Sequence, residues 1–362
     1  MKTKDKALDF LKQMRIPVLG ILMALAFGAV LMLFVDIDPW QAYSVMLRGS
    51  LGGRVQISET LVRATPILLT GLAYAFAYRC GLFNIGAEGQ LYIGALAATI
   101  VAVLIPPMPI FIHLPLALLA GFVGGGLWCA IPGILKAWRG ISETITTIMF
   151  VYIGQYLVSY FVAGPISDTS HFPQSPPIPV YSRLPNILPG TRLNLGFLVA
   201  LAAVLVYYIV LYRSSKGLQI RVVGANIRAA QYIGINAKRT IVLSMLISGG
   251  LAGLGGAVEV IGVQGRLLEG FSPGFGWDGI TVGLLGRTHP VGILLAALFL
   301  GMLRSGGMVM QRTMGVPIAL IYAIQAIIII VGVAGTYADF KKRKLAGDPV
   351  GPDAEVPEGG TN

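Results

Sequence analysis

The segment that decides the architecture of this 362-residue chain is Gly81-Leu82-Phe83-Asn84-Ile85-Gly86-Ala87-Glu88-Gly89-Gln90. It lies between two strongly apolar stretches, Ala64–Arg79 and Leu91–Ile105. Hydrocarbon holds no water for a free backbone group or a carboxylate, so broken, polar backbone at that depth is tolerated only inside protein or beside a wet cavity. The segment therefore indicates a place where a polar solute crosses or binds.

The composition predicts an all-α, polytopic membrane helix bundle. Hydrophobic residues make up 55% of the chain and charged residues 12%, about half the charge of a soluble domain. The apolar residues form blocks of about 20, the length of a helix that spans a bilayer. About ten spans are expected, the second and eighth of them short: Ile16–Val35, Ala64–Arg79, Ile85–Ile105, Leu114–Leu135, Ile141–Val162, Leu195–Tyr212, Ile241–Gly262, Phe275–Leu285, Val291–Met310 and Val316–Gly335.

The distribution of basic residues predicts the orientation. The predicted spans put 19 of the 27 lysines and arginines on the side of the two termini and 8 on the other side, so the positive-inside rule predicts that both termini lie in the cytoplasm. We expect a cytoplasmic segment at 1–15, a transmembrane domain at 16–337 and a disordered cytoplasmic tail at 338–362. The net charge of +11 then reflects the bilayer and gives no reason to expect nucleic acid as a partner.

Two segments are expected on the outer side. Pro39–Val62 mixes apolar and charged residues and suits an amphipathic segment in the interface. The 163–194 loop is rich in proline, so it cannot be helical for long. It is either a plain connector or a docking lip for a partner.

The cytoplasmic 214–240 loop contains a second informative motif. Asn226 suits a helix N-cap, Ile227–Ile233 suits two helical turns, and Gly234 suits a left-handed helix end. A short helix with exposed apolar side chains fits a knob that enters a groove on a soluble partner. It fits equally well a helix lying on lipid headgroups through nearby basic residues.

These motifs, with Ala64–Leu72 and Gly283–Gly292, carry a family resemblance over about residues 15 to 337. The chain resembles the permease subunits of bacterial ABC importers, in the nucleoside-uptake branch of the superfamily that includes ribose and branched-chain amino acid permeases. The Asn-Ile-Gly-x-Glu-Gly core at 84–89 is the most specific element. Ile227 stands where many relatives have proline, a difference that changes little because proline only pre-sets the first helical turn.

The resemblance implies a function and a set of partners. A small polar solute, a nucleoside first of all, would cross the bacterial plasma membrane by alternating access. The partners would be an ATP-binding cassette ATPase, a second homologous permease and an extracytoplasmic substrate-binding lipoprotein. The chain lacks a Gly-x-x-x-x-Gly-Lys-Ser/Thr motif, so it would be no enzyme, and ATP and Mg would be used by the partner. The coupling residues would be Gly224, Ala225, Asn226, Arg228, Ala229, Ala230, Tyr232 and Gly234.

Polar and aromatic side chains in or near the spans are the candidates for the substrate pathway. A neutral nucleoside needs amides, hydroxyls and an aromatic face. The candidates are Asn84, Glu88, Gln90, Tyr152, Gln155, Trp277 and Asp278. Each has a structural alternative as a packed or satisfied core group, and Glu88 in particular suits the cap of a half-helix or an ion pair with Arg63 or Arg79. No cluster has the spacing of metal ligands.

Two further questions stay open at this point. The glycines between Gly249 and Gly256 indicate close helix packing, either within the bundle or between two permeases. An intramembrane acid beside a broken helix is also typical of an ion-gradient-driven secondary transporter, for which Glu88 would be the ion site.

Overall fold

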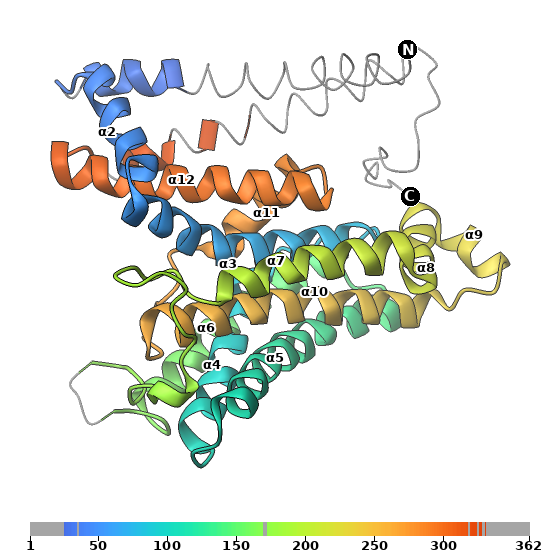
Figure 1. Cartoon of the computed structure of the whole chain (residues 1–362). Helices are drawn as coiled ribbons and strands as arrows, with labels where there is room; N and C mark the ends of the chain where they lie inside the picture. The colour runs from blue at the N-terminus through green and yellow to red at the C-terminus, as the bar shows by residue number, and fades with distance from the viewer. Residues whose placement is uncertain are drawn as a thin grey trace, which may run out of the picture. The chain divides into compact units, whose positions relative to one another are not determined.

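The computed structural model describes residues 25–34, 36–168, 172–317, 319–323, 326–327 and 330. The expected 1–15 segment, half of the first and last spans and the 338–362 tail lie outside these residues, as do both termini. The described residues fold into helices without a strand, and two isolated β-bridges join loop residues (Figure 1). The α-helices are α2 Pro39–Leu51, α3 Arg54–Tyr78, α4 Ala87–Leu104, α5 Ile110–Arg139, α6 Glu143–Ala163, α7 Gly196–Tyr208, α8 Ser215–Ala225, α9 Ile227–Tyr232, α10 Ala237–Glu259, α11 Phe275–Leu285 and α12 Pro290–Met314.

The chain divides into two compact units. The smaller comprises Met1–Ile57 and Met302–Asn362, and within it glycines of α2 and α12 allow close packing, with Gly49 against Val309 and Gly306 against the backbone of Met46. The larger, Ser58–Gly301, contains both motifs identified in the sequence.

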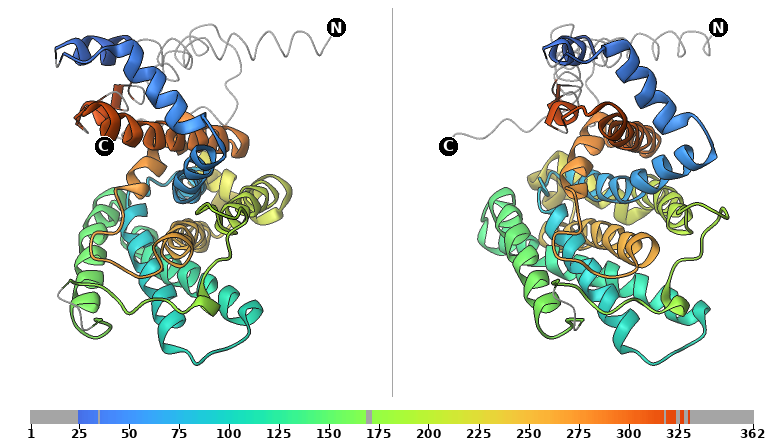
Figure 2. Two further views of the ribbon diagram at one scale, coloured as in Figure 1. Left: turned by 60° about the vertical axis from the view of Figure 1, so that its left-hand side comes forward. Right: turned by 90° about the vertical axis from the view of Figure 1, so that its left-hand side faces the viewer.

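Glycines hold the centre of the larger unit together, where α4, α5 and α10 lie side by side (Figure 2). A Cβ on Gly253 of α10 would lie 2.3 Å from the backbone oxygen of Gly121 in α5, and one on Gly94 of α4 would lie 2.2 Å from the Cα of Gly253. A Cβ on Gly249 would lie 2.3 Å from the backbone oxygen of Gly125. The close packing predicted for these glycines is confirmed, and it occurs within the bundle.

Seven helical segments among the described residues are long and apolar enough to cross a membrane. They are Arg54–Tyr78, Ala87–Leu104, Ile110–Arg139, Glu143–Ala163, Gly196–Arg213, Ala237–Gln264 and Pro290–Met314. The Gly196–Arg213 and Ala237–Gln264 segments include the π-helical turns Ile209–Arg213 and Val260–Gln264. The expected count of ten is therefore not confirmed.

Two of the expected spans show why local rules succeed or fail. The second span is not short, because α3 begins at Arg54 and passes through Pro66 over 25 residues. The expected interfacial segment Pro39–Val62 is accordingly α2 followed by the start of α3. The short eighth span has the predicted bounds, since α11 covers Phe275–Leu285. Its 11 residues extend about 16 Å, half the thickness of the hydrocarbon.

Candidate functional site

The polar segment at 81–90 contains the predicted break, which covers residues 81–86, whereas residues 87–90 already belong to α4. Gly81 has a left-handed φ of 76° and ends α3 in a Schellman motif, in which the amide of Leu82 donates to the carbonyl of Ala77 at 3.1 Å and the amide of Gly81 to that of Tyr78 at 2.9 Å. The backbone from Leu82 to Gly86 is then non-helical until α4 begins at Ala87. We call residues 81–86 the polar break.

Asn84 and Gln90 satisfy each other at the centre of the break. Their side-chain amides exchange two hydrogen bonds of 2.8 and 2.9 Å, and both side chains are buried. Asn84 Nδ2 also donates to Ser248 Oγ of α10 at 2.8 Å, and Ser248 donates to the carbonyl of Ala73 in α3 at 2.6 Å. Hydrogen bonds thus connect the break to α3, α4 and α10. They satisfy polar groups whose burial without a partner would cost much free energy in this environment.

Glu88 caps a second helix from outside. The side chain is 2% exposed, and its Oε2 accepts the backbone N–H of Gly276 at 2.5 Å. Gly276 is the second residue of α11 and Glu88 lies in the first turn of α4, so one carboxylate serves two helix N-termini. The approach requires glycine, because a Cβ on Gly276 would lie 2.2 Å from the backbone nitrogen of Glu88. The capping alternative raised for Glu88 is thus observed.

Glu143, the first residue of α6, also contacts the polar break. Its Oε1 accepts the backbone N–H of Phe83 at 3.3 Å, and its Oε2 forms an ion pair of 2.8 Å with Lys136. The carboxylate therefore connects the end of α5 to the backbone of the break. Glu143 lies 60 residues from Phe83 in sequence, so no local signal indicates the pairing.

The remaining pathway candidates are not buried with Asn84, Glu88 and Gln90. Tyr152 is 54% exposed on α6 and Trp277 is 41% exposed on α11, while Gln155 and Asp278 are half-buried. Two tyrosines missing from the candidates, Tyr156 and Tyr160, follow Tyr152 at intervals of four residues and are also exposed. This spacing puts all three on one helix face, the signal that would have found them. The predicted role of each candidate stays a prediction.

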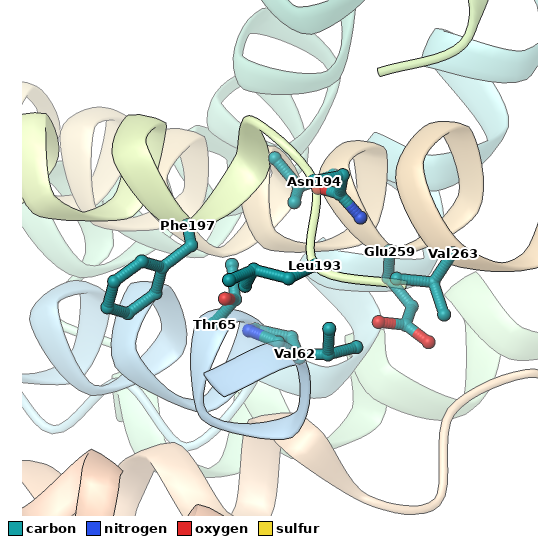
Figure 3. Close-up of a pocket in the computed structure, with 9 residues that line it drawn as sticks. Val62, Thr65, Leu193, Asn194, Phe197, Glu259 and Val263 are labelled. Carbon is teal, nitrogen blue, oxygen red and sulfur yellow. The ribbon is translucent and has the colours of Figure 1, made fainter. Parts of the chain in front are cut away.

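A small cavity lies between α3, α10 and the start of α7 (Figure 3). Its lining residues are Val62, Thr65, Pro66, Leu193, Asn194, Phe197, Val258, Glu259 and Val263. The cavity is too tightly lined to hold a water molecule, and Glu259 beside it accepts a hydrogen bond of 3.2 Å from Gln264 Nε2. It contains none of the candidate pathway residues and does not accommodate a solute.

The motif in the 214–240 loop has the predicted local structure. Asn226 Oδ1 accepts the backbone N–H of Ala229 at 3.0 Å and so caps α9, and Gly234 has a φ of 82°. The amide of Ile235 donates to the carbonyl of Ala230 at 2.9 Å, which completes a Schellman motif. α9 ends at Tyr232, one residue earlier than predicted.

One side of α9 packs against the bundle and the other side is exposed. Ala230 is fully buried, whereas Tyr232 is 92% exposed and Ile233 is 68% exposed. Figure 1 shows α8 and α9 at one end of α3, α7 and α10. The motif therefore forms a projection whose tip exposes Tyr232 and Ile233.

A broken, glycine-packed bundle, in which seven helical segments of the described residues are long and apolar enough to cross a membrane, is typical of a multi-pass membrane transport protein. Residues 56–333 match the family of the branched-chain amino acid transport system permease component. The match covers more than half of the chain, so the chain belongs to this permease family.

Three relatives are similar over almost their whole length. The guanosine ABC transporter permease NupP of Bacillus subtilis is 41% identical over 335 residues, which cover 91% of this chain and 95% of NupP. The glucose ABC transporter permease TsgB13 of Haloferax volcanii is 38% identical over 93% of this chain and 92% of its own. The nucleoside ABC transporter permease NupB of Lactococcus lactis is 33% identical over 88% of this chain and 90% of its own. All three are ABC permeases, which favours the ATP-driven alternative over the ion-gradient-driven one.

Proposed function

We propose that this permease imports a nucleoside across the plasma membrane with energy from a partner ATPase. The observation that carries the substrate class is the 41% identity to a guanosine permease over 91% of the chain, joined by the second nucleoside permease at 33%. The glucose permease at 38% makes a hexose the competing substrate.

We propose further that α9 is the coupling helix and enters a groove on the ATPase. The exposed Tyr232 and Ile233 supply an apolar tip, and the buried Ala230 fixes the helix to the bundle. Asn226 and Gly234 cap the two ends of α9, and these caps stabilise the helix when the bound ATPase moves it. The remaining predicted residues, Gly224, Ala225, Arg228 and Ala229, lie in the same projection.

The exposed tyrosine face of α6 supports a second permease as partner. A phenol that faces hydrocarbon leaves its hydroxyl without a partner, so Tyr152, Tyr156 and Tyr160 fit a wet path or a protein neighbour better than lipid tails. The side chain of Ser159 on the same helix donates to Glu269, in the loop that leads to α11. We propose that this face lines the pathway, together with Gln155 and with Trp277 and Asp278 of α11. We also propose that Asn84, Glu88 and Gln90 stabilise the helices that form the pathway.

Uptake by the reconstituted complex tests the proposal. The chain is co-expressed with its second permease and ATPase, purified in mild detergent and placed in liposomes with the substrate-binding lipoprotein outside. We expect ATP-dependent accumulation of labelled guanosine that unlabelled guanosine suppresses and glucose does not. Glucose accumulation would assign the hexose instead. Uptake that ignores ATP and collapses with an ionophore would contradict the ATP-driven function.

A pull-down of the tagged chain from its native membrane tests the partners. We expect a stoichiometric ATPase and a second permease, identified by mass spectrometry. A chain that purifies alone or as a homodimer across several mild detergents would contradict the proposed assembly.

A further inference from the structure

The cytoplasmic projection touches the polar break through bare backbone. Gly224 is the penultimate residue of α8, and a Cβ on it would lie 2.4 Å from the carbonyl oxygen of Arg79 and 2.9 Å from the backbone nitrogen of Gly81. A Cβ on Gly81 would in turn lie 3.2 Å from the carbonyl oxygen of Gly224. Only glycine permits so close an approach. No side chain separates the two backbones, so a displacement of one backbone toward the other moves it directly.

One aromatic ring reinforces this contact. Tyr212, in the π-helical turn before α8, accepts a hydrogen bond of 2.9 Å from Arg79 Nη2. The guanidinium carbons of Arg79 and Arg221 lie 5.6 and 5.5 Å from the centroid of the Tyr212 ring. Both distances are within the range of a cation–π interaction. Tyr212 therefore joins the end of α3 to α8, alongside the glycine contact.

The two sides of the contact lead directly to the two functional motifs. On one side, α9 begins at Ile227, three residues after Gly224. On the other side, Asn84 follows Gly81 by three residues, and Glu88 then reaches the start of α11. The exposed tip of α9 is thus connected to the buried polar groups by short lengths of chain and one packed junction.

We propose that Tyr212 is a positioning residue, which with Gly224 transmits movement of the 214–240 loop to the polar break. The inference rests on the proposed function, because an ATPase bound at α9 is what would move the loop. Loss of Tyr212 would leave the ATPase bound and active while its movement reaches the break less completely.

The test measures the ratio of uptake to ATP hydrolysis in the reconstituted complex, with guanosine as the probe. The variants are Tyr212→Leu, which removes the ring and the hydroxyl, and Tyr212→Phe, which keeps the ring. Loss of two cation–π contacts and a hydrogen bond should lower guanosine uptake per ATP about tenfold in Tyr212→Leu, with unchanged co-purification of the ATPase. Tyr212→Phe should lower it less than about threefold.

A matched pair of arginine variants distinguishes a loss of coupling from a folding defect caused by the substitution of Tyr212. Arg221→Gln removes one guanidinium from the ring, and Arg213→Gln makes the same change at an exposed neighbour of Tyr212. We expect Arg221→Gln to lower uptake per ATP about threefold and Arg213→Gln to leave it unchanged.

The outcomes separate this inference from the proposed function. If the wild-type complex couples ATP to uptake and both Tyr212→Leu and Arg221→Gln keep the wild-type ratio, the inference is overturned and the proposed function stands. If the wild-type complex recruits no ATPase or takes up guanosine without ATP, the proposed function fails and this inference fails with it.

Discussion

Replacement of Glu88 is the most direct perturbation next to the break, because its carboxylate, in the first turn of α4, accepts the backbone N–H of Gly276 at the start of α11. The N–H of Gly276 is buried and, at the second position of α11, has no partner within its own helix. A hydrogen bond to a charged acceptor contributes about 1.5–3 kcal/mol, and a buried donor left unpaired costs about 1–3 kcal/mol. Glu88→Ala should therefore destabilise the start of α11 by about 2–3 kcal/mol, a 30- to 150-fold shift in its local equilibrium on the scale of about 1.4 kcal/mol per tenfold.

Glu88→Gln separates the hydrogen bond from the charge. Its amide oxygen still accepts from Gly276, so the variant loses only the interaction of the negative charge with the helix ends, about 0.3–1 kcal/mol. The expected order of stability and of uptake is wild type, then Gln, then Ala.

The assay combines unfolding in detergent, co-purification of the ATPase and uptake per ATP for each variant. Asp36→Asn is the control, because it removes the charge of an exposed carboxylate before α2 while asparagine tolerates the left-handed backbone at this position. Its free energy of unfolding should stay within about 0.5 kcal/mol of wild type. Wild-type stability and uptake in Glu88→Ala would refute the reasoning. Loss of ATPase binding would also refute it, since the effect would then not be confined to the break.

Three further predictions follow from other contacts. Gly253→Ala should destabilise the bundle by about 1–3 kcal/mol, because its Cβ would lie 2.3 Å from a backbone oxygen. Gly255→Ala should be neutral, because its Cβ would lie 3.4 Å from the nearest atom, an ordinary contact distance. Equal thermal unfolding of the two variants would contradict this packing. Asn84→Leu should lower the free energy of unfolding by about 1–3 kcal/mol, because it leaves the Gln90 amide unpaired. Adding Gln90→Leu should recover part of that loss in a double-mutant cycle. Strict additivity of the two substitutions would contradict the reciprocal pair. Tyr232→Asp should leave unfolding within about 0.5 kcal/mol of wild type, because the side chain is 92% exposed, but should reduce co-purified ATPase, and undiminished recovery would exclude Tyr232 from the coupling contact.

Local rules predicted those features whose physical causes are local. The bounds of α11 follow from a short apolar block, and the caps of α9 follow from Asn226 and Gly234, whose side chain and backbone preference act within a few residues. A break within 81–90 was predicted because glycines and polar groups do not continue a lipid-facing helix, and the structure narrows it to residues 81–86. In each case the residues that decide the structure are neighbours in sequence.

The same rules failed where a distant segment decides the conformation. Arg287 and Thr288 both adopt left-handed backbone, with φ of 50° and 53°, at the turn between α11 and α12. Neither residue type favours that region. The carbonyl of Thr288 accepts a hydrogen bond of 2.7 Å from the hydroxyl of Tyr207, 81 residues away, which helps to hold the turn.

The amino-acid sequence by itself determined the membrane class, the position of the polar break, the capped α9 helix and the set of polar and aromatic candidates in or near the spans. The tertiary structure alone decided how those residues divide, with Asn84, Glu88 and Gln90 paired inside and Tyr152 and Trp277 exposed. The reason is that hydropathy and capping act over a few residues, whereas a buried polar group is satisfied by whichever segment packs against it. For Glu88 that segment is the start of α11, 188 residues further along the chain.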